Sequence, residues 1–350
     1  MAVAHDVEKP AAVPVVTKPS PVSDGQLERD RLRMMLLIRR FEERTFQEYT
    51  RPGQKIGGFC HLYSGQEAIA VGTAAIFDKT RDYLLNGYRC HGHSLALGMS
   101  PRAAMAELFG KATGCSRGKG GSMHLFQAEV GNMGGHGIVG GQIPLGVGMG
   151  FTQMYLKTGG VTFTFMGDGA INQGTFNESL NLASLYKLPC IFVVENNGVA
   201  MGTQIERSSA DKELARRGGG YAMPHWSIDG NDVDIVIREF SKAMDRARSL
   251  QGPSFIIANT YRFRGHSMSD PMKYRTKEEA ERARLRDPIA LYHSRLQEMG
   301  LINEAEFSRM GEEVGEEIAR ITAQADSDPH PDLQDRFDDV LAEKYPYQPW

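Results

Sequence analysis

The chain has 350 residues, and 40 Lys and Arg against 43 Asp and Glu give a formal net charge of −3. This length can bury a large core, and the near-neutral charge balance does not indicate a nucleic-acid partner. Apolar runs such as Leu188–Val194 are too short to span a membrane. The four cysteines form no C-x-x-C pair, so we expect free thiols in a reducing compartment, at Cys60, Cys90, Cys115 and Cys190.

Residues 1–24 combine four prolines with Ala and Val and contain no aromatic residue, which predicts a disordered arm. Asp6 and Glu8 are present, and no arginine precedes Arg29, which argues against a mitochondrial transit peptide. The apolar core of a signal peptide is also missing from this segment. We therefore expect a cytoplasmic bacterial protein.

A single domain is predicted over residues 25–350, with helical extensions at both ends. The apolar side of Gln26–Thr50 predicts a long helix that ends before Pro52. Gly65–Phe77 predicts a second helix. Ser100-Pro101 predicts the start of a third, with serine as the N-cap and proline in the first turn.

The segment Gly110–Gly150 is unusually rich in glycine. A flexible loop is one interpretation, but the apolar stretches Ile138-Val139 and Ile143–Leu145 favour a packed backbone close to a ligand or another subunit.

Within this segment, Gly135–Gly140 matches the G-x-G-x-x-G pattern of dinucleotide sites. Such a site needs a preceding strand, and Gln127–Met133 does not predict one. It also needs an acidic residue about 20 positions further on. Because Gln142–Gly167 contains no Asp or Glu, we reject a nicotinamide site.

Three apolar, β-rich runs predict buried strands at Val161–Met166, Cys190–Val194 and Phe255–Asn259. Helical patterns separate them, including Asp232–Leu250. This alternation predicts the α/β class, with a mostly parallel sheet flanked by helices. The charged tail from about Thr276 to Leu341 predicts amphipathic helices, broken at Pro288 and around Pro329–Pro331.

Two polar turns follow the first two of these strands. Asp168 offers a carboxylate oxygen, Asn197 an amide oxygen and Val199 a backbone carbonyl. Oxygen ligands with one or two acidic groups suit Mg²⁺. Gly167 and Gly169 would let the backbone approach an anion closely. Because open α/β sheets bind ligands at strand carboxyl ends, we expect a magnesium site here.

Several other residues are candidates for a ligand site. Arg89 has the fork geometry that clamps a diphosphate, although a lone arginine is usually at the surface. His266 follows the third predicted strand and could contact phosphate or move a proton. His61 is an acid or base candidate. A zinc site at His91 and His93 is disfavoured, because no carboxylate or cysteine stands at ligand spacing.

The sequence Gly-Asp-Gly at residues 167–169 is followed, after 26 further residues, by Asn-Asn at residues 196–197. This combination resembles the thiamine-diphosphate fingerprint. With the other motifs, the chain resembles the alpha subunits of pyruvate dehydrogenase E1, in the thiamine-diphosphate-dependent 2-oxoacid dehydrogenase family, from about Arg33 to Arg284. The motifs are Gly58–Leu62, Gly65–Ala68, Tyr88–Gly92, Gly118–His124, Gly137–Gly146, Gly167–Asn197 and Gly265–Pro271.

The resemblance implies a thiamine-diphosphate-binding fold and the cofactors thiamine diphosphate and Mg²⁺. His61 would face the substrate. Related sequences often have Tyr at the position of Val199, and Ser267 matches a phosphorylated position of mitochondrial relatives. The implied cofactor contacts are Tyr88, Arg89 and His266 on the diphosphate, Gly169 and Ala170 on the phosphates, Gly137 and Val139 on the aminopyrimidine, and Asp168, Asn197 and the Val199 carbonyl on Mg²⁺.

The resemblance also implies partners. A beta subunit would complete an α₂β₂ heterotetramer with the cofactor at the subunit interface, and pyruvate carbon would pass to the lipoyl group of a dihydrolipoyl acetyltransferase. Two alternatives stay open. The chain could serve an acetoin or branched-chain 2-oxoacid dehydrogenase, or it could be a scaffold for the beta subunit that has lost its cofactor.

Overall fold

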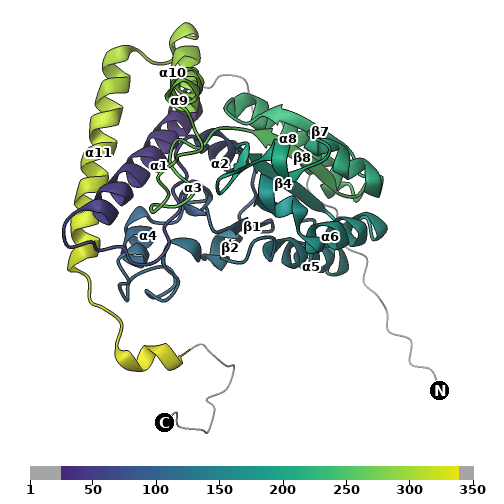
Figure 1. Ribbon diagram of the computed structural model, residues 1–350, viewed down its shortest axis with the longest axis horizontal. Coiled ribbons are helices and arrows are strands. Elements are labelled where there is room, and N and C mark those ends of the chain that lie inside the picture. Colours follow the sequence, from purple (N-terminus) through teal and green to yellow (C-terminus); the bar gives the residue numbers. More distant parts are fainter. Residues whose placement is uncertain (1–24, 339–350) are drawn as a thin grey trace, which may run out of the picture.

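The computed structural model describes residues 25–338, so the arm over residues 1–24 and the predicted helix end at Leu341 lie outside the described residues. A six-stranded sheet with the order β2-β1-β3-β4-β8-β7 forms the centre of the fold, and all its neighbouring strands are parallel (Figure 1). This confirms the predicted α/β class. The strands are β1 Tyr83–Gly87, β2 Asn132–His136, β3 Thr162–Gly167, β4 Cys190–Asn196, β7 His225–Asp229 and β8 Ser254–Asn259.

The three predicted strands are confirmed as β3, β4 and β8, and the other three strands of this sheet were not predicted; nor was the separate two-stranded sheet of β5 (Val199–Ala200) and β6 (Thr203–Gln204). One of them, β2, corrects an expectation from the sequence. We expected no strand before the glycine pattern Gly135–Gly140, but β2 covers Asn132–His136. Its five residues, Asn-Met-Gly-Gly-His, include two glycines and none of the β-branched residues that indicate a strand. The lack of an acidic residue over Gln142–Gly167 still argues against a nicotinamide site.

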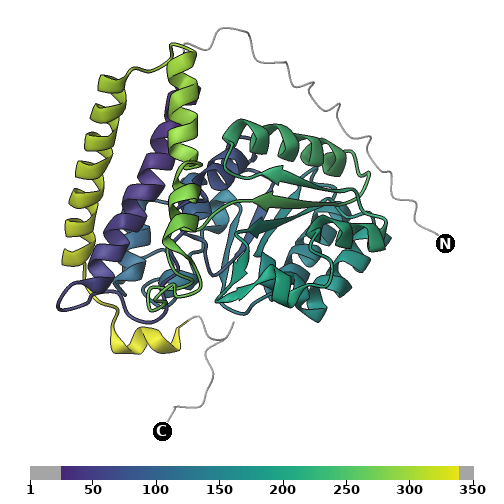
Figure 2. The same cartoon turned by 45° about the horizontal axis from the view of Figure 1, so that its top comes forward.

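Helices cover both faces of the sheet (Figure 2). On one face, Phe163, Phe165 and Val193 pack against α8 (Val233–Arg248) and α2 (Glu67–Ala74). On the other, alternate strand residues such as Phe192 pack against α5 (Gln142–Tyr155) and α6 (Gly174–Leu185). Burial of each such side chain contributes roughly 1.5–3 kcal/mol, and the alternation fixes the strand register.

The first helix, α1 (Gln26–Thr50), has the predicted bounds. The third, α4 (Pro101–Leu108), begins at proline with Ser100 at the N-cap position, as predicted, although the Ser100 side chain makes no capping hydrogen bond. The short helix α3 (His91–Ala96) was not predicted. An N-cap bond does occur at α8, where Asp232 accepts hydrogen bonds from the N–H groups of residues 234 and 235.

The C-terminal helices are α9 (Lys277–Arg284), α10 (Pro288–Glu298) and α11 (Glu304–Ser327), which agree with the predicted breaks at the prolines. Both α10 and α11 pack beside α1 to form a helical block next to the sheet (Figures 1 and 2). Among residues 25–338, no helix combines the length and apolarity needed to cross a membrane. The four cysteines are free, as predicted.

Candidate active site

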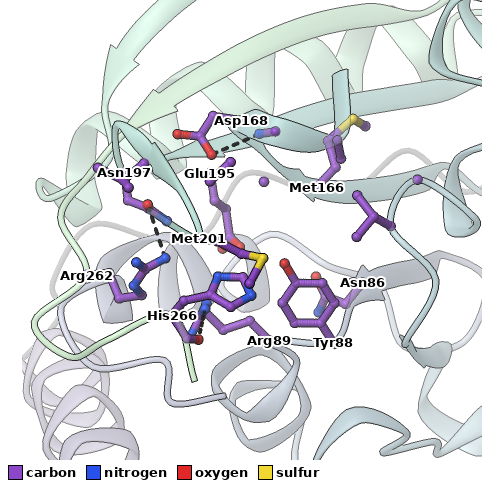
Figure 3. A pocket seen from close by; sticks show the side chains of 18 of the residues that line it. Asn86, Tyr88, Arg89, Met166, Asp168, Glu195, Asn197, Met201, Arg262 and His266 are labelled. Carbon is purple, nitrogen blue, oxygen red and sulfur yellow. Dashed lines mark hydrogen bonds between the residues drawn. The ribbon is translucent and has the colours of Figure 1, made fainter. Parts of the chain in front are cut away.

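A cavity of about 240 Å³ opens at the carboxyl ends of β1, β3 and β4 (Figure 3). Each of these strands is followed by polar residues, so the parallel order brings segments far apart in the sequence to one edge. Nine of the predicted site residues line this cavity: Tyr88, Arg89, Val139, Asp168, Gly169, Ala170, Asn197, Val199 and His266.

Two predicted residues lie outside the cavity lining. The buried His61 ring packs against two lining residues, with its centroid 4.4 Å from that of Tyr88 and 5.3 Å from that of His266. Gly137 lies beside His124, where an added Cβ would come within 3.3 Å of the His124 ring. A side chain at position 137 would therefore crowd its neighbour.

Asp168 has a carboxylate oxygen without a hydrogen-bond partner in the described part of the chain. Its Oδ1 accepts the N–H of Gly169 at 2.9 Å, whereas Oδ2 is buried without a hydrogen bond to any residue of the range 25–338. Burial raises the pKa of Asp168. A buried unpaired carboxylate oxygen is unfavourable, so this atom is suited to receive a cation.

Asn197 lies near it and is held by two contacts. Its Oδ1 accepts a long 3.4 Å hydrogen bond from Arg262 Nη1, and its Nδ2 donates to Gln66 Oε1 at 3.2 Å. Within residues 25–338, no group of three or more His, Cys, Asp or Glu residues could hold a metal. Asp168 and Asn197 therefore offer one carboxylate and one neutral oxygen, which leaves coordination positions for phosphate and water, as Mg²⁺ prefers.

Two buried arginines form a cationic wall. Arg89 donates to the carbonyl oxygens of Leu62 at 2.5 Å and His266 at 2.7 Å. Arg262 is only 2% exposed and donates to the Tyr274 hydroxyl at 2.9 Å. Burial and the charge of Arg262 lower the pKa of Arg89 to about 10, so it remains charged at neutral pH. These cations have no carboxylate ion pair in the described part of the chain, so the wall favours an anion.

Sequence reasoning missed the role of Arg262. Its position three residues after β8 ends was a usable signal, because Asn197 and Asp168 also follow strands. The neighbouring Arg264 gave the same signal, however, and its guanidinium instead stacks on Phe46 at 4.1 Å.

The two predicted histidines are neutral at physiological pH. Burial, followed by the charge of Arg89, lowers the pKa of His61 to about 2. Burial, Arg89 and Arg262 lower that of His266 to about 4. The Nδ1 atoms of both rings are buried and make no hydrogen bond within the described chain. Both can therefore act as neutral hydrogen-bonding groups, but neither is a strong base.

The loop that carries His266 reaches both parts of the site. Asp270 accepts the N–H of His266 and the hydroxyl of Tyr274, both at 2.6 Å. Arg275 donates to the carbonyl of Asn197 at 3.2 Å. These bonds connect the loop to the cationic wall and to the Asn197 side of the cavity.

The glycine-rich segment follows a path fixed by Glu107. This buried carboxylate accepts four backbone N–H groups at 2.7–3.0 Å, from Ser116, Gly118, Gly120 and Gly121. Ser122 in the same loop accepts the N–H of His61 at 3.2 Å. The segment is packed, as expected, although the side chain of Ile138 is 78% exposed.

A second unusual surface lies on α5 and α6, which we call the α5–α6 patch. Its side chains are between 42% and 72% exposed: Leu145, Phe151, Tyr155, Leu156, Leu182, Leu185 and Tyr186. Phe151 lies with its ring 6.0 Å from that of Tyr155 and 6.3 Å from that of Tyr186. Grouped exposed aromatic and aliphatic side chains of this kind indicate a protein interface.

Comparison with known proteins identifies the family to which the chain belongs. The sequence profile of the Dehydrogenase E1 component family matches residues 33–334. The pyruvate dehydrogenase E1 component subunit alpha of Rhizobium meliloti is 47% identical over 310 residues, 88% of each chain. The subunit of the same name from Zymomonas mobilis is 45% identical over 314 residues, 89% of this chain and 88% of its own. The chloroplastic subunit alpha-3 of Arabidopsis thaliana is 42% identical over 316 residues, 88% and 73% of the two chains.

Proposed function

Because the chain belongs to the Dehydrogenase E1 component family, we propose that it is the alpha subunit of a pyruvate dehydrogenase E1 enzyme. The enzyme would decarboxylate pyruvate oxidatively and acetylate the lipoyl group of a dihydrolipoyl acetyltransferase. The names of the relatives and the chemistry of the cavity support this assignment. The unpaired Asp168 oxygen beside Asn197 is the observation that carries it.

The residues present fit thiamine diphosphate and Mg²⁺. Asp168 Oδ2, Asn197 Oδ1 and the Val199 carbonyl would hold the metal, and Gly169 and Ala170 would present backbone to the phosphates. When bound, the cofactor supplies the electron sink for decarboxylation. The remaining assignments are Tyr88, Arg89, His266 and Arg262 on the diphosphate and the backbone of Gly137 and Val139 on the aminopyrimidine.

The charges explain why two arginines and a metal are needed. A diphosphate monoester carries about three negative charges at neutral pH. One arginine ~4 Å from one of these charges contributes about 4 kcal/mol at an effective dielectric of ~20, before desolvation. Arg89 and Arg262 therefore offset only part of the charge, and Mg²⁺ offsets the rest.

The neutral histidines suit roles that need no net charge. His266 Nδ1 can hydrogen-bond a phosphate oxygen or orient one, and neutral His61, beside Tyr88 and His266, can hydrogen-bond the substrate carbonyl. The low pKa of each ring means that a proton taken up at this position is released readily.

We propose that a beta subunit completes the site. Exposed Ile138 and Val139 at the cavity lip, together with the α5–α6 patch, offer the surface for a partner in an α₂β₂ heterotetramer. The four free cysteines, three of them buried, suit a reducing cytoplasm.

Titration calorimetry with thiamine diphosphate and Mg²⁺ tests the proposal, on this chain alone and co-expressed with the beta subunit. We expect tight binding only in the pair. Tight binding by the chain alone would contradict a divided site, and lack of binding by the pair would favour the scaffold interpretation. Carbon dioxide release from pyruvate and 2-oxoisovalerate, with acetoin as a substrate that releases none, then distinguishes pyruvate from branched-chain and acetoin enzymes.

A further inference from the structure

Glu195, the sixth residue of β4, presents a carboxylate at the floor of the cavity that the roles above do not use. It is 6% exposed, and Figure 3 shows it between Asp168 and His266. It makes no ion pair with Arg89 or Arg262 within the described range 25–338. A nearly buried acidic side chain in a cavity meant for an anionic cofactor needs a physical reason.

Two fully buried side chains fix the position of this carboxylate. The hydroxyl of Tyr63 donates to Glu195 Oε1, and His93 Nε2 lies 2.9 Å from the same oxygen. His93 Nε2 also lies 3.0 Å from the Tyr63 hydroxyl, so the three groups form one compact network. Burial and the Glu195 charge hold the pKa of Tyr63 well above its usual range, so this hydroxyl remains a donor.

Both of these contacts are made with Oε1, which leaves Oε2 available to the cavity that Glu195 lines. The metal is already assigned to Asp168, Asn197 and the Val199 carbonyl, so this oxygen is not needed there. The diphosphate is excluded because like charges repel. A positively charged group other than the metal and the arginines complements this oxygen most strongly.

We propose that Glu195 is the binding partner of the cationic thiazolium ring of the cofactor. This inference rests on the proposed function. The charges then match: Asp168 faces Mg²⁺, Arg89 and Arg262 face the diphosphate, and Glu195 faces the ring. Tyr63 and His93 are positioning residues that hold the carboxylate without touching the cofactor.

The test compares two ligands that differ in ring charge. Titration calorimetry on the reconstituted alpha–beta complex measures the affinity for thiamine diphosphate and for thiamine thiazolone diphosphate, whose ring is uncharged. The variant Glu195→Gln should bind thiamine diphosphate on the order of tenfold to a hundredfold more weakly, the loss of one partly screened charge contact. Its affinity for the thiazolone should stay close to that of the wild type.

Asp168→Asn is the matched control, because loss of a metal ligand should weaken both ligands equally. If Glu195→Gln lost the same affinity for both ligands, or lost none, the inference would be overturned. Normal binding of thiamine diphosphate by the wild type would leave the proposed function intact in that case. Absence of wild-type binding would instead remove the proposed function and this inference with it. If Glu195→Gln does not assemble, His93→Gln should show a smaller loss with the same selectivity for the charged ring, and equal losses there would also overturn the inference.

Discussion

The cavity at the ends of β3 and β4 and the α5–α6 patch differ in how far this chain completes them. In the cavity, Asp168 and Arg262 are buried and held by neighbours from several elements. On the patch, Tyr155 and Leu185 are 72% and 67% exposed, and no other described residue covers them. The difference teaches that the charged groups of the cavity are fixed by contacts within this chain, whereas the patch is left exposed by residues 25–338.

The largest effect should come from Asp168→Asn, because it removes the carboxylate that we assign to the metal. Loss of a charge contact with a divalent ion should weaken binding of thiamine diphosphate with Mg²⁺ about a hundredfold or more. Calorimetry on the alpha–beta complex measures this. His61→Ala is the control, since His61 lies outside the cavity lining. Equal affinity of Asp168→Asn and the wild type would refute the metal assignment.

Charging the patch should break assembly and leave the fold of the single chain intact. Tyr155→Glu with Leu185→Glu places two carboxylates where an apolar partner should pack, which we expect to weaken assembly by about a hundredfold. Light scattering after size exclusion reports the oligomeric state. Leu285→Glu, at an 80% exposed position outside the patch, is the matched control. A heterotetramer unaffected by the double substitution would show that the partner binds elsewhere.

Arg262→Met should lower the affinity for thiamine diphosphate about tenfold to a hundredfold, because it removes one of two cations from the wall. Arg264→Met removes the arginine that stacks on Phe46 and should leave the affinity almost unchanged. Calorimetry measures the affinity of each variant for thiamine diphosphate, and the two affinities are compared with each other. If both variants lost the same affinity, Arg262 would not contact the diphosphate.

The smallest effect is a pH dependence of folding stability. Unfolded histidine has a pKa of about 6.5, whereas the folded values of His61 and His266 are about 2 and about 4. Below pH 6.5 the unfolded chain binds protons that the native chain does not, so stability falls as the pH falls, for His266 down to about pH 4. Thermal melts of the isolated chain from pH 7 to pH 4 measure the slope. His61→Gln combined with His266→Gln should flatten it, and an unchanged slope would assign it to other groups.

The sequence predicted the parts of this site that depend on strand ends. Asp168 and Asn197 follow apolar runs that any parallel sheet brings to one edge, so their proximity was predictable. Arg262 was not, because only tertiary packing decides that it is buried while Arg264 stacks on the surface. Glu195 directly precedes the Asn-Asn motif, but its role was not predictable. Its contacts with Tyr63 and His93 join residues that are 132 and 102 positions apart in the sequence. The strand β2 was missed because glycines have little strand propensity, and neighbouring strands impose its conformation.

One carboxylate also decides how freely part of this protein can change during evolution. Glu107 binds the loop of residues 116–121 through backbone N–H groups, which nearly every amino acid provides. Apart from glycines that the path requires, such as Gly118 with a φ of 74°, loop side chains can diverge without altering its course. Glu107 itself has no such freedom. Selection on this loop should therefore fall on a residue outside it.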